Sequence, residues 1–257
     1  MSEKPARKGD MRHFTGLILA VALLGGCSDE AEPAPAEKAR GIVQAPPATP
    51  PAKPDLSACP KAEPVEEQIR TGPIPVPRAF EGVAASSMDH FAFTTLEGST
   101  ICVDTTWLET VDDAELTDNG RFASFAWVGY EAYGYVIVDR TGKGQVIDTG
   151  NAPVRSPSGH RFASVELTES GFGSLNAFAV WDIRPAGLRQ VAEVSEGLPG
   201  GDWRLEGWQG DSCVRLSNVP LERQPEDYRD MDKTARDPWF AAEANRWTPT
   251  PGSCPRP

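Results

Sequence analysis

A four-residue motif that occurs twice constrains the fold more than any other feature of this chain. Arg-Phe-Ala-Ser stands at residues 121–124 and again at 161–164, 40 positions later, each time directly after a glycine-containing turn. Each copy is followed by apolar runs that close on aspartate, at Asp139 and Asp182. A repeat of this length is one supersecondary unit that stacks on its neighbours, because it cannot bury its apolar surface alone.

The runs within each unit are short, rich in β-branched and aromatic residues, and separated by glycine, asparagine or proline, which is typical of strands and turns. Ile101–Asp104 resembles an earlier copy, and Trp203–Trp208 followed by Cys213–Leu216 resembles a last one. We therefore predict an all-β fold of three to four stacked small antiparallel sheets, at about 90–110, 120–149, 160–194 and 202–217. A β-sandwich is the alternative.

The segment from Ser156 to Ala163, followed by Val180-Trp181-Asp182, resembles the repeats of TolB-type β-propellers, whose blades carry a Ser-Pro-Asp-Gly turn before a strand. Here Ser158 replaces the aspartate. The resemblance covers residues 119–194 and implies a propeller-like, incomplete arrangement. It implies nothing about a ligand, because this fold serves many functions.

The N-terminus has the features of an export signal. Four basic residues precede an apolar run from Phe14 to Leu24, which is too short to span a bilayer. Leu24-Gly25-Gly26-Cys27 resembles the bacterial lipobox, which implies lipidation of Cys27 as the mature N-terminus. Met1 and Met11 are both candidate starts. Ser28 after the cysteine implies an outer-membrane location facing the periplasm, with the inner membrane as the alternative.

The domain boundaries follow from composition. Residues 1–26 are the predicted signal peptide, and 27–77 are rich in proline and alanine, which predicts a disordered tether. Residues 78–257 form the predicted β-repeat domain with an extended tail. Asp237-Pro238 followed by Trp239–Ala244 combines an N-cap residue with proline at the first helical position, so we expect one short C-terminal helix there.

Cysteine usage agrees with an oxidising compartment. Four cysteines remain beside Cys27, namely Cys59, Cys102, Cys213 and Cys254, and an even number in an exported chain predicts two disulfides. Cys59–Cys102 with Cys213–Cys254 is the favoured pairing, because each bond would hold a proline-rich tail on a nearby strand. Cys102–Cys213 is the competing pair.

Charge and motif searches exclude several functions. The net charge of −12 becomes −14 after residues 1–26, which carry a net +2, are removed, and so acidic a surface does not bind nucleic acid. No catalytic, phosphate-binding or metal-binding motif occurs, so we predict no catalytic residue, metal or cofactor. His90, His160 and the acidic group Asp112, Asp113, Glu115 and Asp118 are interpreted as structural or solvated residues.

The best candidate for a ligand site is a pair of loops. Trp127, Tyr130 and Tyr133 flank the loop of the second unit, and Phe172 lies in the corresponding loop of the third. The leading hypothesis is a non-enzymatic lipoprotein that binds an envelope protein, peptide or glycan through these loops. The alternative is an envelope-polymer hydrolase that uses Asp202, Glu206 or Asp211.

Replacement of Cys27 by alanine should release the chain from the membrane, because the acidic surface has no other attachment to anionic lipid. Membrane fractionation of cells that express the wild type and Cys27→Ala measures this. A variant that still sediments with the membrane would refute the lipid anchor.

Overall fold

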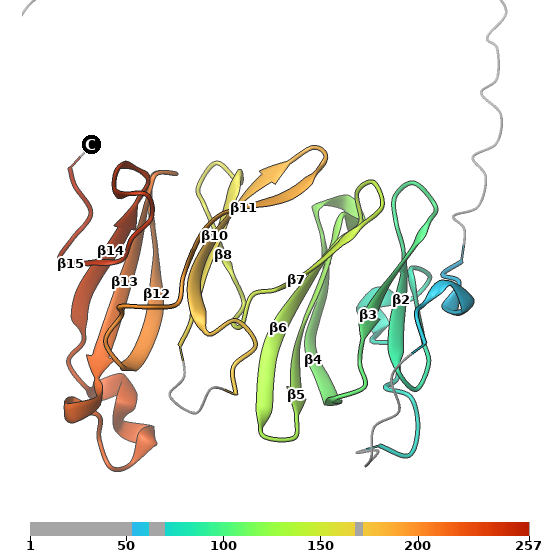
Figure 1. The fold of residues 1–257 in the computed structure, drawn as a ribbon, viewed down its shortest axis with the longest axis horizontal. Helices are drawn as coiled ribbons and strands as arrows, with labels where there is room; N and C mark the ends of the chain where they lie inside the picture. Colours follow the sequence, from blue (N-terminus) through green and yellow to red (C-terminus); the bar gives the residue numbers. More distant parts are fainter. Residues whose placement is uncertain (1–52, 62–69, 168–171, 257) are drawn as a thin grey trace, which may run out of the picture. The chain divides into compact units, whose positions relative to one another are not determined.

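The computed structural model describes residues 53–61, 70–167 and 172–256. The predicted signal peptide, Cys27 and the tether up to residue 52 lie outside these residues. The described chain contains fifteen strands in four small antiparallel sheets, drawn in Figure 1 in the order of the sequence. The fold is therefore all-β with stacked sheets, as predicted.

The first sheet has three strands, and each later sheet is a four-stranded meander of neighbouring strands. The first contains β1 (Ala84–Ser86), β2 (His90–Thr94) and β3 (Thr100–Asp104). The second contains β4 (Leu108–Thr117), β5 (Phe122–Gly129), β6 (Ala132–Asp139) and β7 (Gln145–Asp148). The third contains β8 (Val154–Arg155), β9 (Arg161–Glu166), β10 (Ala177–Arg184) and β11 (Gly187–Val194). The fourth contains β12 (Gly201–Gln209), β13 (Cys213–Pro220), β14 (Asp237–Ala242) and β15 (Thr250–Pro251).

Six short 3-10 helices connect or flank the strands of the described chain. They are η1 (Leu56–Ala58), η2 (Arg78–Phe80), η3 (Asp118–Gly120), η4 (Leu221–Arg223), η5 (Tyr228–Lys233) and η6 (Glu243–Asn245). Within the described ranges, no helical segment has the length and apolar character needed to cross a bilayer.

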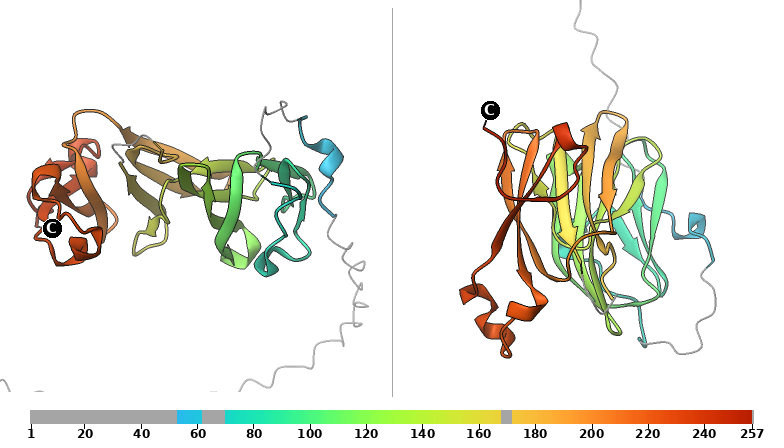
Figure 2. Two further views of the ribbon diagram at one scale, coloured as in Figure 1. Left: turned by 90° about the horizontal axis from the view of Figure 1, so that it is seen from below. Right: turned by 60° about the vertical axis from the view of Figure 1, so that its left-hand side comes forward.

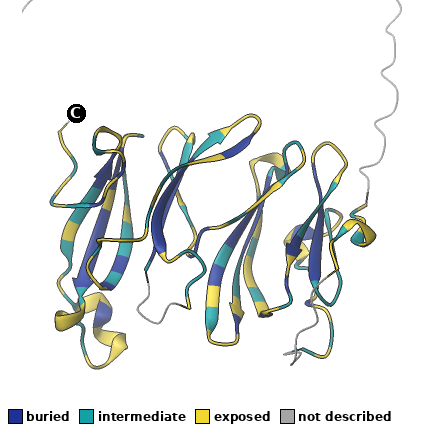
Figure 3. Ribbon diagram, in the orientation of Figure 1, coloured by how far each residue is buried: buried dark blue, intermediate teal, exposed yellow. Residues whose placement is uncertain are grey.

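The second sheet is buried on both faces. Phe125 and Val138 belong to a core shared with Phe93 of the first sheet. Phe122 and Ile137, at alternate positions on the same strands, belong instead to a core shared with the third sheet. Because successive strand side chains point to opposite faces, one strand supplies both cores. Figure 2 shows the sheets as successive layers, and Figure 3 shows their buried strand centres.

The third sheet repeats this arrangement. Phe162 and Trp181 face the second sheet. Val165 and Val180 alternate with them and face the fourth sheet, where they pack with buried Trp203. In the described residues no apolar cluster joins the first sheet to the fourth. Four stacked sheets, rather than the two of a β-sandwich, are thus the observed architecture.

Arginines bridge consecutive sheets at one end of the strands. Arg121 pairs with Asp139 through Nε–Oδ1 at 3.0 Å and Nη2–Oδ2 at 2.8 Å, and donates to the Arg184 carbonyl of the third sheet at 2.6 Å. In the second copy of the motif, Arg161 pairs with Asp182 and reaches Glu243, beyond β14, at 2.9 Å. We call these arginines and their partners the arginine end.

Two unit boundaries differ from the prediction. Residues 108–117 form β4, the edge strand of the second sheet, although the first unit was expected to extend to 110 and the second to begin at 120. Asp112, Asp113 and Glu115 lie on this strand. β4 has no apolar alternation that would identify it in the sequence, because it is an exposed edge strand with acidic side chains. Its pairing with β5 shifts register twice, as is common in bulged edge strands.

The prediction of a helix at residues 237–244 is wrong. Asp237–Ala242 forms β14, which pairs with β13 from Asn218↔Asp237 to Cys213↔Ala242, and Trp239 packs edge-on against Trp203. The local N-cap signal favours a helix by only about 1 kcal/mol, less than strand pairing and core burial contribute together. The longest C-terminal helical element is η5 instead. The fourth sheet therefore extends well beyond the expected residue 217.

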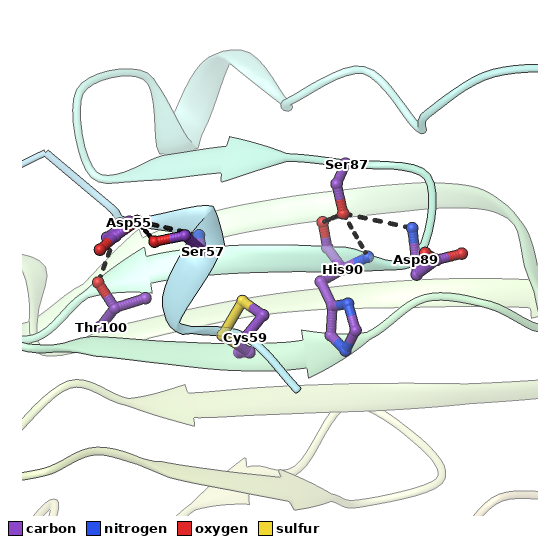
Figure 4. Close-up of a disulfide and its surroundings, with 8 residues drawn as sticks. Asp55, Ser57, Cys59, Ser87, Asp89, His90 and Thr100 are labelled. Carbon is purple, nitrogen blue, oxygen red and sulfur yellow. Dashed lines mark hydrogen bonds between the residues drawn. A yellow bond between two sulfur atoms is a disulfide. The ribbon is translucent and has the colours of Figure 1, made fainter. Parts of the chain in front are cut away.

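Two disulfides hold the tails, in the favoured pairing. Cys59 is bonded to Cys102 and Cys213 to Cys254. Figure 4 shows the first bond, where Asp55 receives a hydrogen bond from Ser57 and its own amide donates to Thr100 Oγ1 at 3.0 Å. Ordered contacts also begin before residue 78, because Ile74 is buried in the first core.

Truncation of Phe125 should cost about 3–5 kcal/mol of unfolding free energy, because its ring is fully buried among aromatic neighbours. Phe172→Ala is the matched control, since that ring is exposed. Urea unfolding followed by tryptophan fluorescence measures both. Equal losses for the two variants would contradict the described core.

The pKa of the Asp118 carboxyl is lowered by a hydrogen bond from Arg155 of the third sheet. A carboxyl group whose pKa is lowered by folding stabilises the folded chain at pH values above its ordinary pKa. This stabilisation is lost as the pH falls through the lowered pKa. Asp118→Asn should cost about 0.5 kcal/mol at neutral pH, since the pair is partly solvated. Unfolding curves should converge with the wild type in acid. A pH-independent difference would contradict the ion pair.

Candidate functional site

The ends of the strands opposite the arginine end carry exposed aromatic side chains. We call this the aromatic end, and it comprises Trp107, Tyr130, Tyr133, Phe172 and Tyr228. They lie in or beside the β3–β4 connection, the β5–β6 hairpin, the β9–β10 connection and η5, which Figure 1 draws along the lower edge. Each sheet boundary thus contributes to one surface.

The two loops named by the sequence do lie together. The amide of Tyr133 donates to the carbonyl of Phe172 at 3.3 Å, and Tyr133 forms a parallel bridge with Gly173. Stacking of the second sheet on the third produces this contact, since residues 133 and 172 are far apart in sequence. The two loops of the candidate ligand site therefore lie side by side.

A groove of about 620 Å³ opens beside this contact. Its walls come from the second, third and fourth sheets and from the segment 221–228. The lining residues are Tyr133, Asn151, Glu166, Leu167, Gly201, Asp202, Trp203, Arg204, Leu221, Gln224 and Tyr228. A site of this size and mixed polarity accommodates a short stretch of an extended ligand.

Glu166 is the most deeply buried charged residue of the groove wall, with 2% of its surface exposed. It ends β9, and its Oε2 accepts hydrogen bonds from the amides of Leu175 at 3.1 Å and Asn176 at 2.9 Å. Its Oε1 has no hydrogen-bond partner among the described residues. A Cβ at Gly173 would overlap the carboxylate, so only glycine fits there.

The other charges of the groove are paired. Arg236 Nη1 lies 2.5 Å from Asp202 Oδ2, and its Nη2 donates to the Asp202 carbonyl. Arg204 contacts Asp202 at 3.3 Å and Asp232 at 2.5 Å. These pairs tie β12 to the segment that follows β13 and hold one side of the groove in shape.

The sequence-predicted ligand residues divide into three groups. Tyr133 lines the groove, and the backbone carbonyl of Phe172, which is not among the lining residues, accepts a hydrogen bond from the Tyr133 amide. Tyr130 is exposed at the aromatic end but is absent from the groove lining. Trp127 is partly buried and packs against the core between the first two sheets.

The two histidines of the described residues lie in different environments. His90 is buried in β2, and Figure 4 shows its ring pointing away from the Asp89 side chain that could have oriented it. His160 is exposed in a turn at the arginine end, beside Asp211. In the part of the chain that the structure describes, no group of three or more candidate ligands could hold a metal ion.

Only two carboxylates of the hydrolase alternative lie near each other, because Asp202 and Glu206 both contact Arg236, at 2.5 Å and 4.0 Å. Asp202 is the second residue of β12 and Asp211 follows the other end of the strand, which places them about 25 Å apart at about 3.3 Å per strand residue. Paired glycosidase carboxylates lie roughly 5–10 Å apart. Glu206 accepts a hydrogen bond from Ser217 at 2.5 Å, and Asp211 accepts one from the Ser158 amide at 3.0 Å.

Glu166, Arg236 and Tyr228 were not found from the sequence. Alignment of the two motif copies does single out Glu166. It occupies the position of Ala126, so a charged residue replaces alanine in an otherwise similar strand. Arg236 and Tyr228 lie outside the repeats, in a charged segment with no periodicity. Only the folded chain brings Tyr228 to the groove wall and Arg236 to Asp202.

Comparison of the chain with protein-family models, with curated proteins and with solved structures found no significant match.

Proposed function

We propose that this chain is a lipid-anchored protein of the bacterial cell envelope whose β-domain binds an extended segment of another polypeptide in the groove at the aromatic end. Cys27 supplies the membrane anchor, and the proline-rich segment after it holds the domain away from the membrane. The observation that carries the binding role is the groove itself, with side chains from three sheets on its walls.

The backbone of the groove favours a polypeptide over a glycan. β12 is the edge strand of the fourth sheet, and its residues 201–204 line the groove consecutively. An edge strand presents backbone N–H and C=O groups at intervals that match another extended chain. Exposed Tyr133 and Tyr228 offer flat apolar contacts for its side chains, as aromatic residues do in many interfaces.

The geometry supports binding better than hydrolysis. Asp202 is held by Arg204 and Arg236, and Glu206 lies against the same Arg236, so a cation neutralises both carboxylates. Asp211 lies beyond the other end of β12, where it accepts a hydrogen bond from the Ser158 amide. None of these arrangements resembles a matched acid and base across one cleft.

Tyr228 and Tyr130 form a matched pair for a test, because their exposures are 70% and 71% but only Tyr228 lines the groove. A photoreactive phenylalanine at position 228 should cross-link one defined polypeptide in the native envelope, and the same group at position 130 should give much less of it. Gel mobility and mass spectrometry measure the adducts.

Equal adducts from both positions, or adducts with glycan alone, would contradict the proposed site. Turnover of a muropeptide that is abolished by Asp202→Asn would favour the hydrolase instead. Each chain must first give the unfolding curve of the wild type.

A further inference from the structure

Glu166 leaves the groove with one uncompensated negative charge. Asp202 and Arg204, the other charged residues that line it, are paired with each other and with Arg236 and Asp232. A buried carboxylate is stable only when ionic or hydrogen-bonding partners replace the water it has lost. Two amides occupy Oε2 of Glu166, whereas Oε1 is without a partner in the described chain.

The number of free oxygens restricts the ligand. A guanidinium group binds carboxylates best through two parallel hydrogen bonds that use both oxygens. At Glu166 only the buried Oε1 lacks a partner in the described chain, because Oε2 already accepts from Leu175 and Asn176. A primary ammonium is a compact point charge that needs a single carboxylate oxygen and directs its other N–H groups elsewhere.

Further groups of the groove suit an ammonium. The Asn151 amide nitrogen donates to the Val165 carbonyl at 2.8 Å, so its orientation is set, and its carbonyl oxygen receives no hydrogen bond from a described residue. Tyr133 and Tyr228 present aromatic rings, whose faces attract cations.

We infer that the groove recognises a lysine side chain of the bound polypeptide and that Glu166 is the residue that receives its ammonium group. This inference rests on the proposed function, since it names the chemistry recognised in the same groove. Gly173 is required for this recognition, because any side chain at position 173 would displace the Glu166 carboxylate.

The probe is lysine with its backbone ends blocked, Nα-acetyl-lysine-N-methylamide, added to the full mature chain that carries Cys27→Ala. Amide chemical shifts around Glu166, Asp202 and Tyr228 should move, with a Kd on the order of 1 mM, which is the range of ligands this small. The same probe acetylated on its side-chain nitrogen should bind at least about tenfold more weakly, because it has no charge.

Glu166→Gln should abolish the preference for the charged probe over the acetylated one. Glu193→Gln is the matched control, since it makes the same chemical change on an exposed residue of β11 and should leave the preference unchanged. A role of Glu166 limited to holding residues 175 and 176 would alter both probes equally, so the preference separates recognition from structure.

Equal binding of both probes to the wild type, a preserved preference in Glu166→Gln, or no shift with either probe would each overturn the inference. The proposed function would then still stand or fall by cross-linking at position 228. A second variant, Gly173→Ala, keeps the test open if Glu166→Gln fails to fold, and it should also reduce the preference.

Discussion

The second and third sheets have no free face, and this burial on both sides governs the rest of the structure. In β5 and β9, alternate side chains enter different cores. Phe122 and Phe125 are three positions apart on β5, so they point to opposite faces and stabilise different sheet interfaces. A shift of one residue in register would exchange the two cores. The sequence must therefore specify both faces of each middle strand, and the repeated Arg-Phe-Ala-Ser motif does so with a ring for one face and a small residue for the other.

The same motif makes the two ends of the sheets different. Its arginine pairs with the aspartate of the adjacent strand and contacts the next sheet, so Arg121 and Arg161 close one end with polar bonds. At the other end, the β3–β4 connection, the β5–β6 hairpin, the β9–β10 connection and the segment after β13 present the exposed aromatics and the groove. The arginine bridges that join consecutive sheets thus lie at one end of the strands and leave the aromatic end available for a ligand.

Much of the fold could be predicted because it depends on local patterns. The two motif copies gave the stacked sheets, and the count and placement of cysteines favoured the observed disulfides. β4 was missed because an exposed, bulged edge strand needs no apolar alternation. β14 was taken for a helix because its pairing partner, β13, is nineteen or more residues away and leaves no local sign.

The site was predictable only in part. Tyr133 and Phe172 follow from the equivalence of two loops, whereas Glu166 becomes informative only when its missing partner and its place in the groove wall are seen. The most direct measurement of the central claim, that three sheets share one binding groove, is hydrogen exchange with and without the polypeptide captured through position 228. The account predicts simultaneous protection near residues 133, 166 and 201–204, with the arginine end unchanged. Protection confined to one sheet, or located around Arg161, would contradict it.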